Sequence, residues 1–182
     1  MGPWVLRQDQ CPSCRKFIFA FQYSTRQPFQ VWPKGSSRPA PPKEAPRAFA
    51  SDYSEACLVL PDSAKASAAL SRRCLQNILR EVAKVKPSDL WKEIQEVLDG
   101  KTLPSYIANG LDAVRNIGNF AAHPIKSQHT GEVMDVEPGE AEWNLDILES
   151  LFDFYFVQPA QLQAKKDALN KKLVEAGKPP LK

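Results

Sequence analysis

Residues 63–84, SAKASAALSRRCLQNILREVAK, carry the clearest amphipathic pattern in the chain. Apolar side chains recur there every four residues, with Ala69 and Leu75 alongside, at Ala66, Leu70, Cys74, Ile78 and Val82. Such spacing places them on one face of an α-helix, and Asp62 or Ser63 can cap its first turn. The stretch therefore predicts a long helix that buries this stripe against other helices.

Helical patterns continue on both sides of this stretch. We expect further helices over about 51–60, 88–99, 105–122, 138–157 and 159–176, most of them bounded by proline or glycine. Gly100 and Gly177 are expected to cap two of them, and Pro159 is expected to separate the last two. Because each wide apolar face must be covered, the pattern predicts an all-α bundle.

The N-terminal part has a different pattern. Phe17, Phe19 and Phe21 alternate with other side chains, and residues 29–32 follow a turn that contains proline, so two short strands are predicted as a hairpin. Proline recurs over 33–50, which predicts an extended linker. The expected organisation is a partial zinc-ribbon-like segment, a linker, a helical domain and a basic C-terminal helix and tail. Their ranges are 1–32, 33–50, 51–160 and 161–182.

Charge is unevenly distributed along the 182 residues. Residues 1–126 have a net charge of +7, residues 127–164 one of −8, and residues 165–182 one of +4. A nucleic acid would be repelled from the acidic segment and tolerated elsewhere. No apolar run reaches the ~20 residues that span a bilayer, and residues 1–7 show no basic region followed by an apolar stretch. We therefore expect no signal peptide and a cytoplasmic protein without membrane contact.

Four cysteines are present. Cys11 and Cys14 have the spacing of half a zinc site, but a structural zinc needs four ligands, so they predict at most a vestigial, incomplete site and no other cofactor. Cys57 and Cys74 fall on predicted helices, where free cysteine usually behaves as a small buried hydrophobe.

Arg115, Asn119 and His123 are spaced by four residues, so on a helix they form one polar ridge, each displaced about 40° from the last. A cation, an amide and an imidazole placed in this way can hold a phosphate and move a proton near neutral pH. The alternative is structural, because the helix dipole favours histidine near a helix C-terminus and Asn119 can bond to neighbouring backbone. For Arg72 and Arg73, which are adjacent on the long helix, a surface ion pair is the corresponding alternative.

Three runs, taken together and in order, are similar to the domain-of-unknown-function 4145 family within the HEPN superfamily of helical domains. They are Tyr53-Ser54-Glu55-Ala56, residues 68–75 (AALSRRCL) and residues 111–123 (LDAVRNIGNFAAH). Cys11-Pro12-Ser13-Cys14 resembles the zinc knuckle of that family, and the resemblance covers about residues 10–160.

The resemblance implies a HEPN-like helical bundle, often dimeric, in which an arginine and a histidine form a metal-independent ribonuclease site at the dimer interface. On this chain Arg115 would bind the scissile phosphate and His123 would act as general acid or base. Asn119 and Asn116 would orient or contact substrate, with Arg72 and Arg73 as further substrate-binding candidates. Seven residues separate Arg115 from His123 where the superfamily usually has four to six, which puts their Cα atoms roughly 12 Å apart on a straight helix.

Two functions stay open on these residues. One is a prokaryotic defence or toxin-type domain that acts on or binds RNA, as an endoribonuclease of a toxin–antitoxin or antiviral system. The other is a catalytically inactive dimerisation or partner-binding module of a defence or restriction system. The expected partners are a second copy of the chain, RNA, and an antitoxin or defence-system protein.

Overall fold

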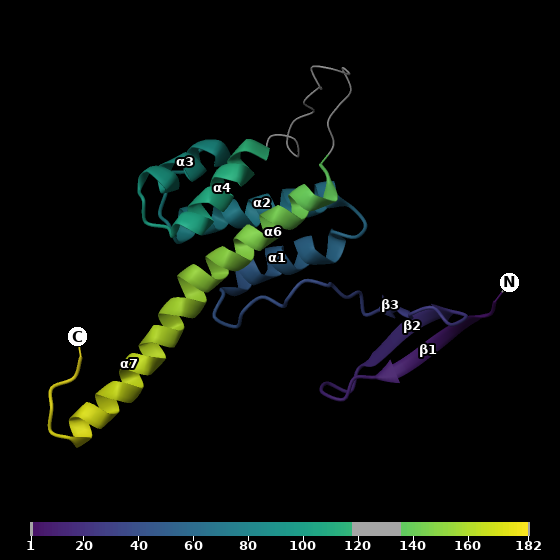
Figure 1. The fold of residues 1–182 in the computed structure, drawn as a ribbon, viewed down its shortest axis with the longest axis horizontal. Helices are drawn as coiled ribbons and strands as arrows, with labels where there is room; N and C mark the ends of the chain where they lie inside the picture. Colours follow the sequence, from purple (N-terminus) through teal and green to yellow (C-terminus); the bar gives the residue numbers. More distant parts are fainter. Residues whose placement is uncertain (1, 118–135, 182) are drawn as a thin grey trace, which may run out of the picture. The chain divides into compact units, whose positions relative to one another are not determined.

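The computed structural model describes residues 2–117 and 136–181, and it divides the chain into an N-terminal unit, residues 1–39, and a helical unit, residues 40–182 (Figure 1). The described chain is mostly helical and has one small antiparallel sheet, which confirms the predicted fold class at this level. Among the described residues, no helix is long and apolar enough to cross a membrane. Asn119 and His123 lie outside the described residues.

The N-terminal unit is a three-stranded antiparallel sheet of β1 (Trp4–Gln10), β2 (Phe17–Tyr23) and β3 (Phe29–Trp32), in the order β1-β2-β3. The predicted hairpin corresponds to β2 and β3, and β1 was missed. After Trp4, Val5 and Leu6 this strand continues with Arg, Gln, Asp and Gln, so its own apolar alternation is weak. The strand is stabilised instead by cross-strand pairs with β2 over its whole length, from Trp4 opposite Tyr23 to Gln10 opposite Phe17.

The helical unit begins earlier than its sequence pattern suggested. Its elements are α1 (Arg47–Val59), α2 (Ala64–Glu81), α3 (Leu90–Asp99), α4 (Ser105–Ile117), α6 (Pro138–Phe152), a π-helical segment η1 (Asp153–Val157) and α7 (Gln158–Glu175). The first helix was expected from residue 51 and begins at Arg47, directly after Pro46, because proline is favourable at a helix start.

Helix α2 packs against three neighbours, mainly α1 and α6 and to a smaller extent α3. Ser63 caps it by accepting a hydrogen bond from the backbone N–H of Ala66 at 3.1 Å, as its side chain predicts. Its buried residues are Ser67, Ala68, Ser71, Cys74, Leu75, Ile78 and Leu79. This face is broader than the predicted stripe and rotated from it, so Leu70 and Val82 are only half-buried. A helix that contacts several neighbours must bury more than one narrow row of side chains.

The core of the helical unit is contributed by α1, α2, α3, α4, α6 and the α2–α3 connection. Its fully buried large side chains are Tyr53, Ile78, Leu79, Ile94, Ile107, Leu111, Val114, Leu145, Leu148, Leu151 and Phe152. Helices α4 and α6 approach closely where Gly110 faces Ile147, because a Cβ at Gly110 would overlap the Cδ1 methyl of Ile147. The indole N–H of Trp143 donates to the Gly110 carbonyl oxygen at 3.2 Å across the same contact.

The two predicted glycine caps behave differently. Gly177 has a φ of +66° and ends α7, with the Lys178 N–H bonded to the Leu173 carbonyl at 2.8 Å, as predicted. Gly100 occupies the C-cap position of α3 in a right-handed conformation, and the left-handed residue is Lys101, at a φ of 51°.

Pro159 does not interrupt the chain's last helix. Helices α6 and α7 form one continuous rod through η1 (Figure 1). Proline has no N–H to donate to the carbonyl four residues before it and clashes with that carbonyl in a regular α-helix. Here the N–H of Gln158 bonds to the carbonyl of Asp153, five residues back, so the wider π-helical turn accommodates the proline.

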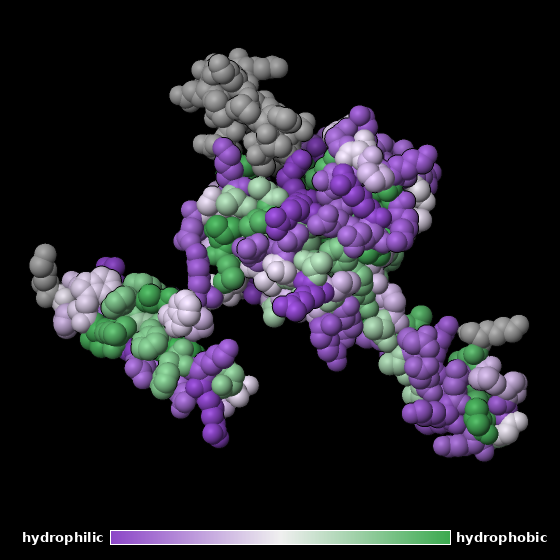
Figure 2. Space-filling model, turned by 180° about the vertical axis from the view of Figure 1, so that it is seen from behind, coloured by the Kyte–Doolittle hydropathy of each residue, from purple (hydrophilic) through white to green (hydrophobic). Residues whose placement is uncertain are grey.

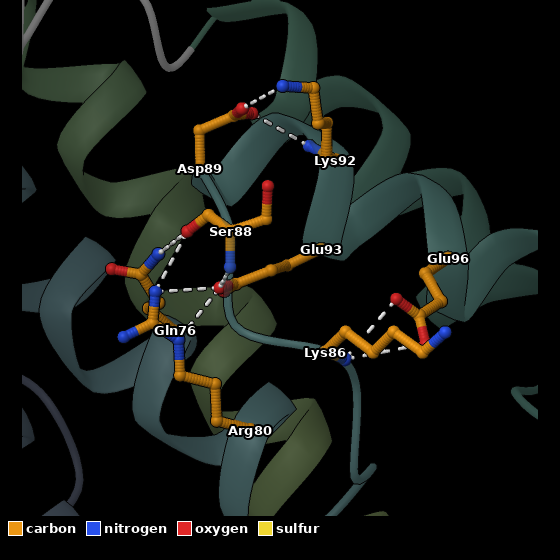
Figure 3. Close-up of polar contacts among 8 residues, drawn as sticks. All are labelled: Gln76, Arg80, Lys86, Ser88, Asp89, Lys92, Glu93 and Glu96. Carbon is orange, nitrogen blue, oxygen red and sulfur yellow. Dashed lines mark hydrogen bonds and ion pairs between the residues drawn. The ribbon is translucent and has the colours of Figure 1, made fainter.

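A buried carboxylate fixes the connection between α2 and α3. Glu93 is 0% exposed, and its Oε1 accepts hydrogen bonds from the Arg80 Nε and the Ser88 backbone N–H, both at 2.7 Å (Figure 3). Arg80 also donates to the Ser88 carbonyl at 2.8 Å, and Gln76 donates to the same oxygen at 3.2 Å. Asp89 caps α3 through the Lys92 N–H at 3.0 Å. The start of α3 is thereby fastened to α2.

We predict that Glu93→Gln lowers the free energy of unfolding by about 2 kcal/mol, because Arg80 would lose its charged partner in a buried setting. Glu96→Gln is the matched control, since Glu96 is exposed and accepts only weakly from the Lys86 N–H, at 3.3 and 3.4 Å. Urea unfolding followed by circular dichroism measures both variants, and equal effects would show that the Glu93 network is not a structural constraint.

A double-mutant cycle tests the close approach of α4 and α6. Gly110→Ala should lose part or all of the about 1 kcal/mol by which alanine is otherwise favoured over glycine in a helix interior, because its methyl group overlaps the Cδ1 of Ile147 and that side chain must move. In an Ile147→Val background, which lacks the overlapping methyl, the same change should recover most of this advantage. Thermal unfolding of the four proteins gives the coupling energy, and a value near zero would contradict the contact.

Candidate functional site

The polar ridge predicted on α4 is described only in part. Arg115 and Asn116 lie in the last turn of α4, while Asn119 and His123 lie outside the described residues, so the structure does not test their convergence with Arg115. Asn116 is exposed, and its side-chain amide donates to the Asp112 carbonyl at 2.9 Å within the same helix. This bond is local to α4.

The Arg115 side chain is held by three groups of the helical unit. Its guanidinium donates to the Gln95 side-chain oxygen, forms an ion pair with Asp112 at 2.5 Å, and lies over the Trp91 ring with its Cζ 5.0 Å from the centroid. Two of these residues belong to α3, so the side chain bridges α3 and α4. It is only 17% exposed.

This environment limits what Arg115 can do. The Asp112 carboxylate already neutralises the guanidinium, and a phosphate would have to displace it or share the cation with it. Stacking on Trp91 adds a cation–π contribution that ties the side chain further to α3. The Nε atom is buried and has no hydrogen-bond partner among the described residues, so one donor is not used by them. In this conformation Arg115 is a bridge between helices rather than an open phosphate-binding group.

Arg72 and Arg73 have separate surroundings on α2. Arg73 is bound by Asp52 of α1 through two contacts, Nε at 3.2 Å and Nη2 at 2.6 Å, with Glu55 3.7 Å away, which is the ion pair considered from the sequence. Arg72 is half-buried, burial lowers the pKa of its guanidinium, and it forms no hydrogen bond or ion pair with residues 2–117 or 136–181. No hydrogen bond or ion pair joins either residue to Arg115 within those ranges.

Cys11 and Cys14 lie at the turn that joins β1 and β2. The turn is closed by backbone hydrogen bonds of 2.9 Å, from the Cys11 N–H to the Lys16 carbonyl and from the Arg15 N–H to the Cys11 carbonyl. Hydrogen bonds from the N–H groups of Cys14 and Ser13, the first being the larger effect, lower the pKa of the Cys11 thiol. Two thiols cannot complete the four-ligand set of a structural zinc, and the described residues contain no group of three or more metal-binding side chains.

The other two cysteines are buried in the helical unit, as predicted. Cys74 donates its S–H to the Phe49 carbonyl at 3.4 Å, and burial raises its pKa to about 12. Such a thiol is protonated at neutral pH and has the character of a packing residue.

Sequence reasoning missed the residues that position Arg115. Trp91 and Gln95 are one helical turn apart on α3, a spacing that could have drawn attention to this face. Glu93 was also missed, because a carboxylate in the first turn of a helix is usually exposed, whereas the structure buries it. The buried polar contact of Tyr53 was also missed. Its hydroxyl donates to Glu149 at 2.7 Å. Burial, and to a smaller extent this hydrogen bond, raises the pKa of Tyr53.

The π-helical segment borders an apolar pocket of about 660 Å³. Phe154 and Tyr155 of η1, Pro159 and Leu162 of α7, and Thr102 contribute to its walls. π-Helical turns are often found at functional sites, so this pocket is the second candidate site of the helical unit.

Comparison with known proteins gives a family assignment. No curated protein and no solved structure matches the chain significantly. A family model matches residues 54–172, which is more than half of the chain and extends from α1 into α7. The chain therefore belongs to the family described as Domain of unknown function (DUF4145).

Proposed function

We propose that the helical unit is a catalytically inactive dimerisation module, related to the HEPN superfamily, in which a second copy of the chain packs against α7. The observation that carries the proposal is the exposed apolar face of α7. This is the second of the two functions that the sequence leaves open.

Helix α7 has no buried residue over its 18 positions, although it is part of the family match up to Lys172. Leu162 and Leu169 are spaced by seven residues, and Leu173 lies one turn further along the same face. Leu162 is 57% exposed and Leu169 is 46% exposed. Most of the stability of a helix in a protein comes from covering such a face, and leucines at this spacing are typical of helix pairing.

Charge favours an antiparallel arrangement of two copies. The lysines of α7 (Lys165, Lys166, Lys171 and Lys172) follow a stretch, residues 127–164, that has acidic residues but no lysine or arginine. A parallel pair would place the two basic segments side by side. An antiparallel pair places each basic segment near the acidic end of the partner's α6 and η1, close to Asp153, which is favourable at short range.

The pocket at η1 offers a place for the partner's leucines. It opens beside the first turns of α7, and its aromatic and aliphatic walls include Tyr155 and Leu162. In an antiparallel pair the C-terminal half of the partner's α7, with Leu169 and Leu173, lies next to this pocket. Filling it would bury apolar surface on both copies.

The state of Arg115 disfavours the ribonuclease alternative. A catalytic arginine should be free to meet a phosphate as charge develops, whereas this one is neutralised by Asp112 and held by Trp91 and Gln95. The RNA-directed defence or toxin function, and a dimer interface along the Arg115 ridge, stay predictions, because they depend on Asn119 and His123.

We predict that the chain is a dimer at micromolar concentration and that Leu169→Glu makes it monomeric, because a charge would be buried in the helix pair. Val174→Glu is the matched control, since Val174 is 63% exposed but lies about 120° around α7 from Leu162 and about 140° from Leu169. Sedimentation equilibrium measures all three proteins, and circular dichroism verifies that they keep their helices.

Two outcomes would refute the dimer. One is a wild-type chain that stays monomeric at several hundred micromolar, and the other is an equal response to the Leu169 and Val174 variants. The antiparallel direction has its own test: Lys171→Glu with Lys172→Glu should weaken the dimer, and adding Asp153→Lys should restore it. Lack of restoration would contradict that direction.

We also predict that the chain, incubated with total RNA in the presence of a chelator, cleaves no more than its His123→Ala variant does. Gel analysis of the RNA gives the result. Metal-independent cleavage that disappears in both Arg115→Ala and His123→Ala would establish the ribonuclease and overturn the inactive module.

A further inference from the structure

One face of the N-terminal sheet is formed mostly by large apolar side chains. Residues paired across antiparallel strands share a face, and the register pairs Trp4 with Tyr23 and places Phe21 between Leu6 and Phe29. By the same register, this face, called the aromatic face below, contains Trp4, Leu6, Gln8, Gln10, Phe17, Phe19, Phe21, Tyr23, Phe29 and Trp32. Its two polar residues, Gln8 and Gln10, lie opposite Phe19 and Phe17 at the end near the β1–β2 turn. The opposite face is mixed, with Val5, Arg7, Asp9, Ile18, Ala20, Gln22 and Gln30.

The aromatic face is exposed within the N-terminal unit. Trp4 is 62% exposed, Trp32 64% and Phe29 54%. The rings form an ordered cluster, with the Trp4 centroid 5.0 Å from Tyr23, 6.4 Å from Phe21 and 6.2 Å from Phe29. Hydrophobic side chains gather on the visible surface of this sheet (Figure 2). A contiguous exposed apolar surface of this kind marks a binding site.

The charge of the unit indicates the class of ligand. Residues 1–39 contain six lysines or arginines and a single acidic residue, Asp9, so their net charge is +5. Arg15, Lys16 and Arg26 are exposed in the turns that join the strands, at both ends of the aromatic face. Stacking surfaces bordered by cations are what unpaired bases and their phosphates need.

A pocket at one end of the aromatic face combines both features. It has a volume of about 510 Å³ and is lined by Gly2, Trp4, Tyr23, Arg26, Gln27 and Phe29. The Arg26 guanidinium lies over the Tyr23 ring, with its Cζ 5.7 Å from the centroid. Three aromatic walls can stack on a base, the Gln27 amide can hydrogen-bond its edge, and Arg26 can pair with a phosphate.

We propose that this sheet binds single-stranded nucleic acid, with bases stacked on the aromatic face and one nucleotide held in the pocket beside Arg26. The requirement for splayed bases excludes a duplex, because paired bases stack on one another and present no free ring face. A protein partner is the less favoured occupant, because it would have to be strongly acidic as well as apolar. The proposal is independent of dimerisation through α7.

Fluorescence anisotropy of the full chain with labelled 12-nucleotide oligo(U), oligo(dT) and a duplex of the same length tests the site. Single strands should bind at low salt and the duplex much more weakly. Trp4→Leu keeps an apolar side chain but removes a stacking surface, and should weaken single-strand binding about tenfold. A comparison of oligo(U) with oligo(dT) distinguishes RNA from DNA as the preferred strand.

Arg26→Gln tests the charge and has a matched control. It should weaken binding several-fold and reduce the slope of log affinity against log salt, because one phosphate contact is lost. Arg7→Gln removes the same charge from the opposite face, where Arg7 lies 3.9 Å from Asp9, and should have a smaller effect. The Arg26 side chain is exposed, so Arg26→Gln should keep the fold of the sheet. It therefore tests the site even if Trp4→Leu fails to fold.

Three results would overturn the proposal: no single-strand binding by the wild-type chain at low salt, equal binding of the duplex, or Arg26→Gln and Arg7→Gln variants that lose affinity equally. If the wild-type chain binds no nucleic acid, and Trp4→Leu differs from it in the molecular mass of its assembly, the aromatic face is a protein contact instead. A monomeric chain that still binds single strands would refute only the α7 dimer.

Discussion

The buried Glu93 carboxylate is the constraint on which the arrangement of the helical unit depends. A buried charge is costly unless it is paired, and here Arg80 and the backbone N–H of Ser88 meet it at 2.7 Å. Both bonds go to Oε1, while Oε2 is buried and has no hydrogen-bond partner among the described residues, and the bonds of Oε1 hold the start of α3 against α2. Because α3 is fixed in this way, Trp91 and Gln95 are presented to α4 and hold Arg115 between the two helices.

The rod formed by α6, η1 and α7 changes its character along its length. Its first part lies in the core and approaches α4 as closely as Gly110 allows, whereas its last part buries nothing. The π-helical turn lies at this transition. It accommodates Pro159, and the apolar pocket opens beside it. The exposed leucines of the last part and the charge along the rod are what support the proposed pairing with another copy of the same rod.

The two units have different surface chemistry and are proposed to have different ligands. The sheet is basic and aromatic, which suits unpaired bases and phosphates. In the helical unit the candidate phosphate-binding residue, Arg115, is already paired with Asp112, which is why the nucleic-acid site is proposed on the sheet. A dimer of such chains would carry two sheets, and two linked sites bind one strand more tightly than one site does.

The sequence by itself determined the positions of most helices, a cap for α2 at Asp62 or Ser63, and the burial of Cys57 and Cys74. These features follow from local spacing and from hydrogen bonds within a few residues, which a linear pattern records. Strand β1 was not predicted, because its apolar alternation is weak and its stability comes from pairing with β2. The partners of Arg115, the burial of Glu93 and the continuity of the rod through Pro159 were decided by tertiary structure. They depend on which helices pack together and on which side chains then come into contact. Gln95 and Arg115, for example, are 20 residues apart, and no local periodicity predicts a hydrogen bond between residues so far apart in the sequence.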